Sequence, residues 1–409
     1  MSKNGREAAP RGPTNKLAIP RLPSFKDFPV NPIAIQTLYY SMVAFYGSYL
    51  TLYFGSIGFS KTQIGLITSI STLAVFLTQP LWGQASDRAK DGRTVLSILF
   101  VACGVLIFGY YFTTDYIPVL IIASVYAMFY NAIAPNMDSL TLESFEKSPG
   151  RFHYGHARVG GTIGYSIMVL VAGRVFSVSY THMFYMTSIL CFAMLFFVRK
   201  ASSVKARGKR GPISLKALIA NKKILCFMFI NLIQAFGMLG FYTFYPLHFV
   251  ERIGSESMFG VILFVTAMSE LPFWFISGKI AKRFGRERLM VIAISVFGAR
   301  WIALYFLTNF PLLLAVNLVH GFCYATINYC IVTYINDEVP HELRATGQTM
   351  NNLSAMVVSR IIGGAVIGAL SDAFGVGSMF VFLAVLSFAG AAVFYIWIKA
   401  LDKAPIGNP

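Results

Sequence analysis

Apolar residues run along this chain in long segments that are separated by short polar stretches. Because a helix needs about 20 consecutive apolar residues to cross the hydrocarbon core of a bilayer, each segment is predicted to be a transmembrane helix. The pattern predicts twelve such helices, at residues 31–54, 62–83, 94–113, 116–138, 157–178, 180–198, 223–250, 256–280, 288–308, 311–335, 346–370 and 376–398. We therefore expect an all-α membrane protein.

The longest polar stretch, residues 199–222, has six predicted helices on either side. This spacing predicts two six-helix bundles, at 31–198 and 223–400, with residues 199–222 as the linker between them. Residues 1–30 and 401–409 are expected to be tails. The first tail runs straight into a full-length apolar segment, so we expect no cleavable signal peptide.

Composition agrees with this class, because 56% of the residues are hydrophobic and only 12% are charged. Soluble domains carry about 25% charged residues, which excludes a soluble enzyme, a disordered protein and a nucleic-acid binder. The net charge of +17 arises from 34 Lys+Arg against 17 Asp+Glu. These cations gather in the tails and in every second loop, whereas the opposite loops hold only Lys61 and Arg252. The positive-inside rule then predicts a multi-pass protein of the cell membrane with both termini and the linker in the cytoplasm.

No motif for chemistry on a soluble substrate or a cofactor is present. The five cysteines lie in apolar runs without metal-ligand spacing, so we expect buried thiols, no disulfide framework and no metal site. We find no Walker loop, dinucleotide fingerprint, HExxH or nucleophile elbow, which indicates that the chain is not an enzyme and binds no cofactor. The expected partners are a small-molecule solute and the lipid bilayer, and we expect a monomer.

Arg174 lies near the end of a predicted helix, where it can reach the membrane surface, whereas six other ionisable residues within the predicted helices are harder to explain: Asp138, Arg158, Glu270, Arg300, His320 and Arg360. A cation at the membrane centre costs about 2.5–3.5 kcal/mol even on the lenient insertion scale, so such residues normally face a partner or a wet cavity. Convergence on one central cavity would pair these charges and offset their burial. The alternative is a set of separate structural ion pairs that hold helices together.

A sequence string is repeated at equivalent places in the two halves. GQASDRAKDGR at 83–93 follows the second predicted helix, and GKIAKRFGRER at 278–288 follows the eighth. The pair resembles the signature loop of the major facilitator superfamily, G-x-x-x-D-R/K-x-G-R-R/K, although Lys282 stands where Asp is usual. The residues concerned are Gly83, Asp87, Arg88, Arg93, Gly278, Arg283 and Arg286. The resemblance implies two pseudo-symmetric six-helix bundles, with Asp87 locking them together in one access state.

A second resemblance concerns Pro135–Asp138 and the string YGHARVGGTIGY at 154–165. Both are similar to the lactose-permease-type oligosaccharide:proton symporters, and the second string is equally similar to the phenylpropionate-permease-like branch. The resemblance implies that Asp138 and Arg158 clamp the substrate and that Tyr165 stacks on its ring.

In the second half, Glu270, Arg300 and His320 fall where that family keeps an acid, an arginine and a histidine for proton coupling. Glu270 would hold a proton while Arg300 is distant and lose it when Arg300 approaches, so protons are the expected coupling ion. Cys323 departs from the pattern, because the lactose-type symporters carry a glutamate there. The string His320-Gly321-Phe322 is closer to the phenylpropionate-permease-like branch.

The nature of the solute stays open at this point. Three embedded arginines against two carboxylates leave an unmatched cation, which favours an aryl or sugar carboxylate, whereas an Asp138–Arg158 clamp with Tyr165 favours a neutral polyol. Arg360 decides between them according to whether it faces the cavity. Among the aromatic residues of the first and seventh helices, Tyr46 and Tyr242 are selected as solute contacts.

The leading hypothesis is a secondary transporter that works by alternating access, with proton-coupled symport of a small polar organic solute. A proton-driven exporter of amphipathic compounds is the first alternative, and it would favour a more apolar cavity than six ionisable residues indicate. A non-transporting membrane sensor is a further alternative, although the loops leave no room for a receptor domain.

Overall fold

The computed structural model describes residues 30–146, 154–201, 221–339 and 344–403, and these residues are almost entirely helical. The first half contains α1 (Val30–Ser56), α2 (Lys61–Arg88), α3 (Gly92–Leu106), the 3₁₀ turn η2 (Ile107–Tyr111), α4 (Tyr116–Glu146), α5 (Tyr154–Phe176) and α6 (His182–Lys200). The second half contains α8 (Lys222–Leu239), the π-helical turn η3 (Gly240–Phe244), α9 (Tyr245–Ile253), α10 (Glu256–Phe284), α11 (Arg286–Phe306), α12 (Phe310–Glu338), α13 (Arg344–Phe374) and α14 (Ser378–Lys403).

The predicted fold class is confirmed, with α8, η3 and α9 forming one continuous span. Eleven helical segments among the described residues are long and apolar enough to cross a membrane. The remaining predicted span is α1, which has 27 residues and no charged side chain. Tyr39, Tyr40, Tyr46, Tyr49 and Tyr53 make α1 less apolar than the others, because a phenol is only partly hydrophobic.

Several helices extend beyond the predicted windows. Helix α2 has 28 residues and α4 has 31, which correspond to about 42 Å and about 46 Å of helix, longer than the hydrocarbon core of about 30 Å. The hydropathy pattern marks only the part of each helix that lies in hydrocarbon. The polar ends that follow are also helical, and this corrects the predicted bounds.

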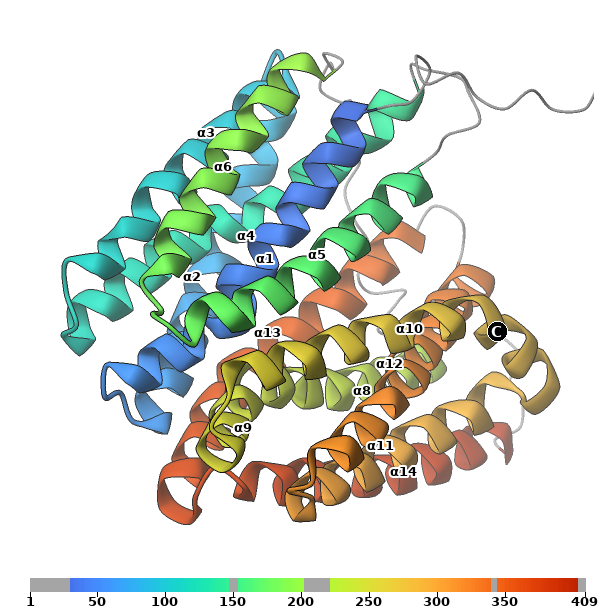
Figure 1. Ribbon diagram of the computed structural model, residues 1–409. Helices are drawn as coiled ribbons and strands as arrows, with labels where there is room; N and C mark the ends of the chain where they lie inside the picture. Colours follow the sequence, from blue (N-terminus) through green and yellow to red (C-terminus); the bar gives the residue numbers. More distant parts are fainter. Residues whose placement is uncertain (1–29, 147–153, 202–220, 340–343, 404–409) are drawn as a thin grey trace, which may run out of the picture.

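The twelve spans form two bundles, one from each half of the chain (Figure 1). In the first bundle α3 and α6 pack together on the flank that faces away from the second bundle, and α11 and α14 do the same in the second (Figure 1). The main contacts between bundles are made by α2 with α13 and by α5 with α10. We call the membrane face at which α1 begins and α14 ends the tail side, and the opposite face the far side.

The bundles are held together on the far side. At the crossing of α2 and α13, a Cβ added to Gly65 would lie 2.0 Å from the carbonyl oxygen of Gly364, so only glycine permits this approach. The Ser69 hydroxyl, one turn further along α2, donates to the carbonyl oxygen of Ile361 at 2.8 Å. Toward the tail side the ribbons of the two bundles diverge (Figure 1), and Leu77 of α2 is 64% exposed.

Charged groups complete the far-side closure. The Asp372 carboxylate at the end of α13 accepts the backbone N–H groups of Lys61 and Thr62, the first two of α2, each at 2.8 Å. The Lys61 ammonium lies 2.7 Å from the Glu251 carboxylate of α9. Because the first N–H groups of a helix have no partner within the helix, Asp372 caps α2 from the other bundle.

Tyr180, in the connection between α5 and α6, adds a third link between the bundles. Its hydroxyl donates to the Glu256 carboxylate of α10 at 2.7 Å. Burial, followed by this hydrogen bond, raises the pKa of Tyr180 above its ordinary value. The phenol therefore keeps its proton and can donate it throughout the physiological pH range.

Candidate functional site

The embedded residues of the first bundle come from α1, α4 and α5. The Asp138 carboxylate of α4 accepts hydrogen bonds from the Gln36 amide of α1 at 2.7 Å and from the Tyr154 hydroxyl of α5 at 3.0 Å. The Arg158 guanidinium, one turn beyond Tyr154, lies over the Tyr40 ring with 4.3 Å between Cζ and the ring centroid. The predicted clamp of Asp138 with Arg158 is therefore not closed in this conformation, since each group binds a neutral partner.

Arg158 also lies within electrostatic range of the second bundle. Its side chain is exposed, and it is close enough to Glu270 of α10 and Tyr324 of α12 to interact with them electrostatically. Tyr165, two turns further along α5, shares a hydrogen bond of 3.1 Å with the Ser48 hydroxyl and also lies within electrostatic range of Glu270. The arginine and the tyrosine selected from the sequence thus share the face of α5 that is turned toward Glu270.

Glu270 and His320 are brought together by close helix packing. A Cβ on Gly321 would lie 2.0 Å from the Ser269 carbonyl oxygen, so α10 and α12 touch backbone to backbone at this point. The Gly321 N–H donates to the Ser269 hydroxyl at 3.0 Å. Glu270 follows Ser269 and His320 precedes Gly321, so these two residues are neighbours across the contact. The His320 Nε2 lies 3.6 Å from the Glu270 carboxylate.

The environments of these two groups differ. The His320 side chain is fully buried, whereas that of Glu270 is 22% exposed. The His320 ring stacks between Phe241 and Tyr324, with ring centroids 5.4 Å and 5.6 Å away. Glu270 is therefore the more accessible of the two groups, and His320 is held beside it.

Arg300 of α11 is 2% exposed and lies deeper in the second bundle. Its guanidinium donates to the Asn317 side-chain oxygen at 2.7 Å and lies over the rings of Trp301 and Phe241, at 4.6 Å and 4.9 Å from Cζ to the centroid. Aromatic faces and one amide therefore stabilise the buried cation. Arg300 is close enough to His320 to interact with it electrostatically but does not form an ion pair with Glu270 in this conformation.

Arg360 of α13 lies at the junction between the bundles. Its carbonyl oxygen accepts from the Ser69 hydroxyl of α2 at 3.2 Å, and its exposed side chain is within electrostatic range of Tyr130 of α4. Arg360 therefore lies within electrostatic range of the first bundle, and whether it contacts the solute stays a prediction.

Tyr242 and Tyr46, the two other aromatic residues selected from the sequence, differ in how exposed they are. Tyr242 lies in the π-helical turn η3, is half-buried, and is within electrostatic range of Tyr165 and Glu270. Tyr46 is only 7% exposed, and its ring packs against Tyr126 with centroids 4.5 Å apart. In this conformation Tyr46 belongs to the aromatic core of the first bundle. Its role as a solute contact stays a prediction.

Most of the repeated string lies in helix ends, and only residues 89–91 and Gly285 lie between helices, which corrects the interpretation from the sequence. Gly83, Asp87 and Arg88 lie in the last turns of α2, Gly278 and Arg283 lie in α10, and Arg286 is the first residue of α11. The Asp87 side chain lies outside what the structure describes. The Arg93 guanidinium pairs with Asp91, and that of Arg286 pairs with Asp337, so each of these cations ties elements within its own bundle.

Several polar residues at this junction were missed from the sequence. Gln36 is fully buried and binds Asp138, Asn317 binds Arg300, and Glu143 is a further buried carboxylate of α4 that accepts from Ser139 at 3.2 Å. Tyr324 could have been found, because it follows His320 by four residues and therefore lies on the same helix face. A single amide in an apolar segment, such as Gln36, gives a weaker signal.

Two helical bundles that meet around embedded charges, and that are held together at one membrane face, have the architecture of a membrane transporter. A sequence model of the MFS_1-like family matches residues 35–382, so the chain belongs to this family, and the predicted superfamily is confirmed. Because its relatives are permeases, it is not an enzyme.

An uncharacterized transporter of Bacillus subtilis, YwbF, is 26% identical over 71% of this chain and 73% of its own length. The maltose permease of Geobacillus stearothermophilus is 22% identical over 83% of this chain and 86% of its own length. The crystal structure of the nucleoside transporter NupG superposes with a TM-score of 0.81 at 17% identity, and covers 91% of this chain and 99% of the other. At that identity the structural similarity shows the fold alone.

Proposed function

We propose that the protein is a proton-coupled symporter of the cell membrane, and that its solute is a ring compound bearing a carboxylate, either a sugar acid or an aromatic acid. One observation carries the proposal. Arg158 lies over the Tyr40 ring and Arg360 lies within electrostatic range of Tyr130, and among the described residues neither accessible arginine forms a close ion pair with a carboxylate. Guanidinium groups bind carboxylates with two parallel hydrogen bonds, and the aromatic faces around them suit a ring.

The coupling follows from competition for Arg158. Glu270 is a carboxylate of the other bundle within electrostatic range of Arg158, so an ionised Glu270 competes with the solute carboxylate for the same guanidinium. Protonation of Glu270 removes the competitor, and the adjacent His320 can accept or donate that proton. Solute and proton therefore bind together, which is the requirement for symport.

Charge balance gives this proposal a sharp consequence. One carboxylate and one proton move together, so each transport cycle is electrically neutral. Symport of a neutral sugar with one proton would instead carry one positive charge and respond to the membrane potential.

The proposal includes orientation. The tail side carries nearly all the cations, which supports its assignment to the cytoplasm. With that assignment, the bundles are closed on the outside and accessible from inside, which is an inward-open state. A fluorescent protein fused to the C-terminus should fluoresce in cells, because that fusion folds in the cytoplasm, and a dark but inserted fusion would contradict this orientation.

The test is uptake into proteoliposomes of solute pairs that differ only in the carboxylate, such as glucuronate against glucose and phenylpropionate against phenylpropanol. A pH gradient should drive accumulation of the acid but not of its neutral partner, and a potassium diffusion potential set with valinomycin should leave accumulation unchanged. Transport of glucose that responds to the potential would favour a neutral sugar, as in the maltose permease relative, and would overturn the carboxylate assignment.

Two variants test the residues. Arg158→Gln should abolish uptake of the acid, whereas Arg174→Gln, an exposed arginine on the same helix, should not. Glu270→Gln should abolish accumulation driven by the pH gradient while sparing exchange of labelled for unlabelled solute. Unimpaired accumulation in Glu270→Gln would exclude this carboxylate as the coupling group.

A further inference from the structure

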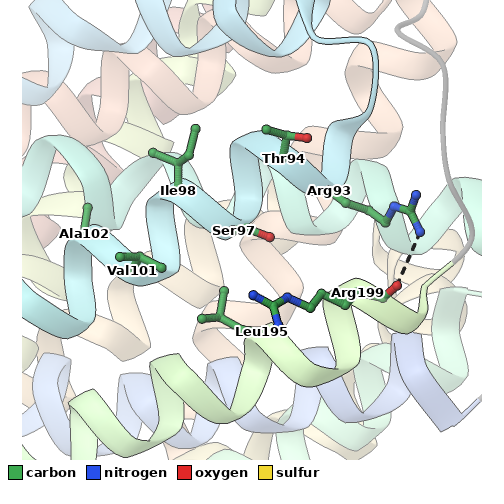
Figure 2. Close-up of a pocket in the computed structure, with 8 residues that line it drawn as sticks. All are labelled: Arg93, Thr94, Ser97, Ile98, Val101, Ala102, Leu195 and Arg199. Carbon is green, nitrogen blue, oxygen red and sulfur yellow. Dashed lines mark hydrogen bonds between the residues drawn. The ribbon is translucent and has the colours of Figure 1, made fainter.

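A groove of about 670 Å³ lies between α3 and α6, on the flank of the first bundle that faces away from the second (Figures 1 and 2). It is therefore separate from the junction at which solute transport is proposed. Its apolar part is formed by Ile98, Val101, Ala102 and Leu195, and its tail-side end is formed by Arg93 and Arg199 with Ser97 and Thr94 nearby. An apolar floor that ends in cations matches the profile of a phospholipid, whose acyl chains are capped by a phosphate.

The two arginines have different tasks. The Arg93 guanidinium is held by the Asp91 carboxylate at 2.6 Å and by the backbone carbonyl oxygens of Arg199 and Ala201, at 3.3 Å and 3.1 Å. It fixes the start of α3 to the end of α6, and Asp91 balances its charge. The Arg199 guanidinium instead lies in the groove, which Ser97 also lines (Figure 2). The end of the groove therefore carries one positive charge that Asp91 does not balance.

The position along the helices fits a lipid as well. Arg93 is the second residue of α3 and Arg199 is the last but one of α6, so both lie at the tail-side ends of their helices. From Arg93 to Ala102 the helix rises about 14 Å, which is the depth of a headgroup and the upper part of the acyl chains. Ile98 and Val101 expose 51% and 42% of their surface, as expected for side chains that contact acyl chains.

From these observations we infer that the groove between α3 and α6 binds an anionic phospholipid of the tail-side leaflet. The phosphate accepts hydrogen bonds from the Arg199 guanidinium and the Ser97 hydroxyl, and an acyl chain lies along Val101 and Leu195. A net negative headgroup is preferred over a zwitterionic one, because the second headgroup charge of a choline would face the cationic end of the groove.

Native mass spectrometry of the full chain in detergent tests this site. In a micelle the added lipid can reach the groove whichever way the protein is oriented in a membrane. Dioleoyl phosphatidylglycerol should give more bound lipid than dioleoyl phosphatidylcholine, which has the same acyl chains. In Arg199→Gln the affinity for phosphatidylglycerol should fall about fivefold, the equivalent of about 1 kcal/mol per basic residue near an anionic surface. Arg288→Gln, an exposed tail-side arginine of the second bundle, is the matched control and should bind as the unmodified protein does.

A second variant separates the groove from general charge effects. Ala102→Phe keeps every charge but fills the apolar floor, so it should also lose phosphatidylglycerol binding, with thermal unfolding measured to verify that the variant folds. Equal binding of the two lipids by the unmodified protein would overturn the inference. An equal loss in Arg199→Gln and Arg288→Gln would overturn it too, since that result indicates diffuse attraction without a site.

Discussion

The far-side closure gives the most direct test of how this transporter is held in one state. Asp372 of α13 accepts the first two N–H groups of α2 from the other bundle, each at 2.8 Å. In Asp372→Ala both N–H groups lose their acceptor. Because the Asp372 carboxylate and the two N–H groups belong to different bundles, the loss destabilises the closed far side relative to the open one, and each bundle keeps its own packing.

The magnitude follows from the geometry. Loss of a capping side chain costs about 0.5–2 kcal/mol, and a carboxylate at a helix N-terminus contributes about 0.3–1 kcal/mol of the same interaction. Asp372 is exposed, so solvent screens it and water can replace it, and we take about 1 kcal/mol. The ratio of open to closed far side should therefore rise about fivefold. Asp372→Asn retains an acceptor oxygen and should produce a smaller rise.

The assay is a distance distribution between spin labels on the two bundles. Cysteines introduced at Val178 and Thr308, both exposed on the far side, accept the labels. All five native cysteines are buried, so they should react slowly with a polar reagent and can stay in place. In Asp372→Ala the longer distance should gain population, whereas Asp115→Ala, which removes a far-side carboxylate of the α3–α4 connection, should leave the distribution unchanged. An unchanged distribution in folded Asp372→Ala would refute the assignment of this cap as part of the closure.

Two further predictions concern helix packing and the buried cation. Gly65→Leu should lengthen the same far-side distance, because even a Cβ at this position would lie 2.0 Å from the Gly364 carbonyl oxygen. A closed far side in this variant would show that α2 and α13 can shift to accommodate the leucine side chain. Asn317→Leu should lower the free energy of thermal unfolding by about 1.5–3 kcal/mol, because the buried Arg300 guanidinium loses its hydrogen bond at 2.7 Å. A melting temperature equal to that of the unmodified protein would contradict this prediction.

The hydrophobic pattern predicts the number and order of the spans because every transmembrane helix must be apolar over the width of the hydrocarbon core. It fails at helix ends such as Glu146 and Arg88, where the helix continues into the headgroup region and polarity no longer reports secondary structure. The break at 199–222 is visible for the same reason, since no apolar segment covers it.

Only part of the candidate site can be predicted from the sequence. The cost of burial alone identifies Arg158, Glu270 and His320 as residues that need partners, but it does not say which. The pairing of Asp138 with Gln36 depends on the register of α1 against α4, and the placement of Arg360 beside Ser69 depends on contacts between the bundles. Such long-range registers arise from side-chain packing, which no local pattern encodes.

The π-helical turn at Gly240–Phe244 has a consequence for how this gene can change. A π-helical turn holds one residue more than an α-helical turn and is absorbed locally, so the helices on either side keep their faces. Deletion of one residue at this turn would convert it to a regular helix and leave α8 and α9 intact, whereas the same deletion elsewhere in this span would rotate every following side chain by about 100°. The turn is thus the place in the seventh span where a change of one codon in length can be tolerated, and it contains Tyr242, the tyrosine selected as a solute contact.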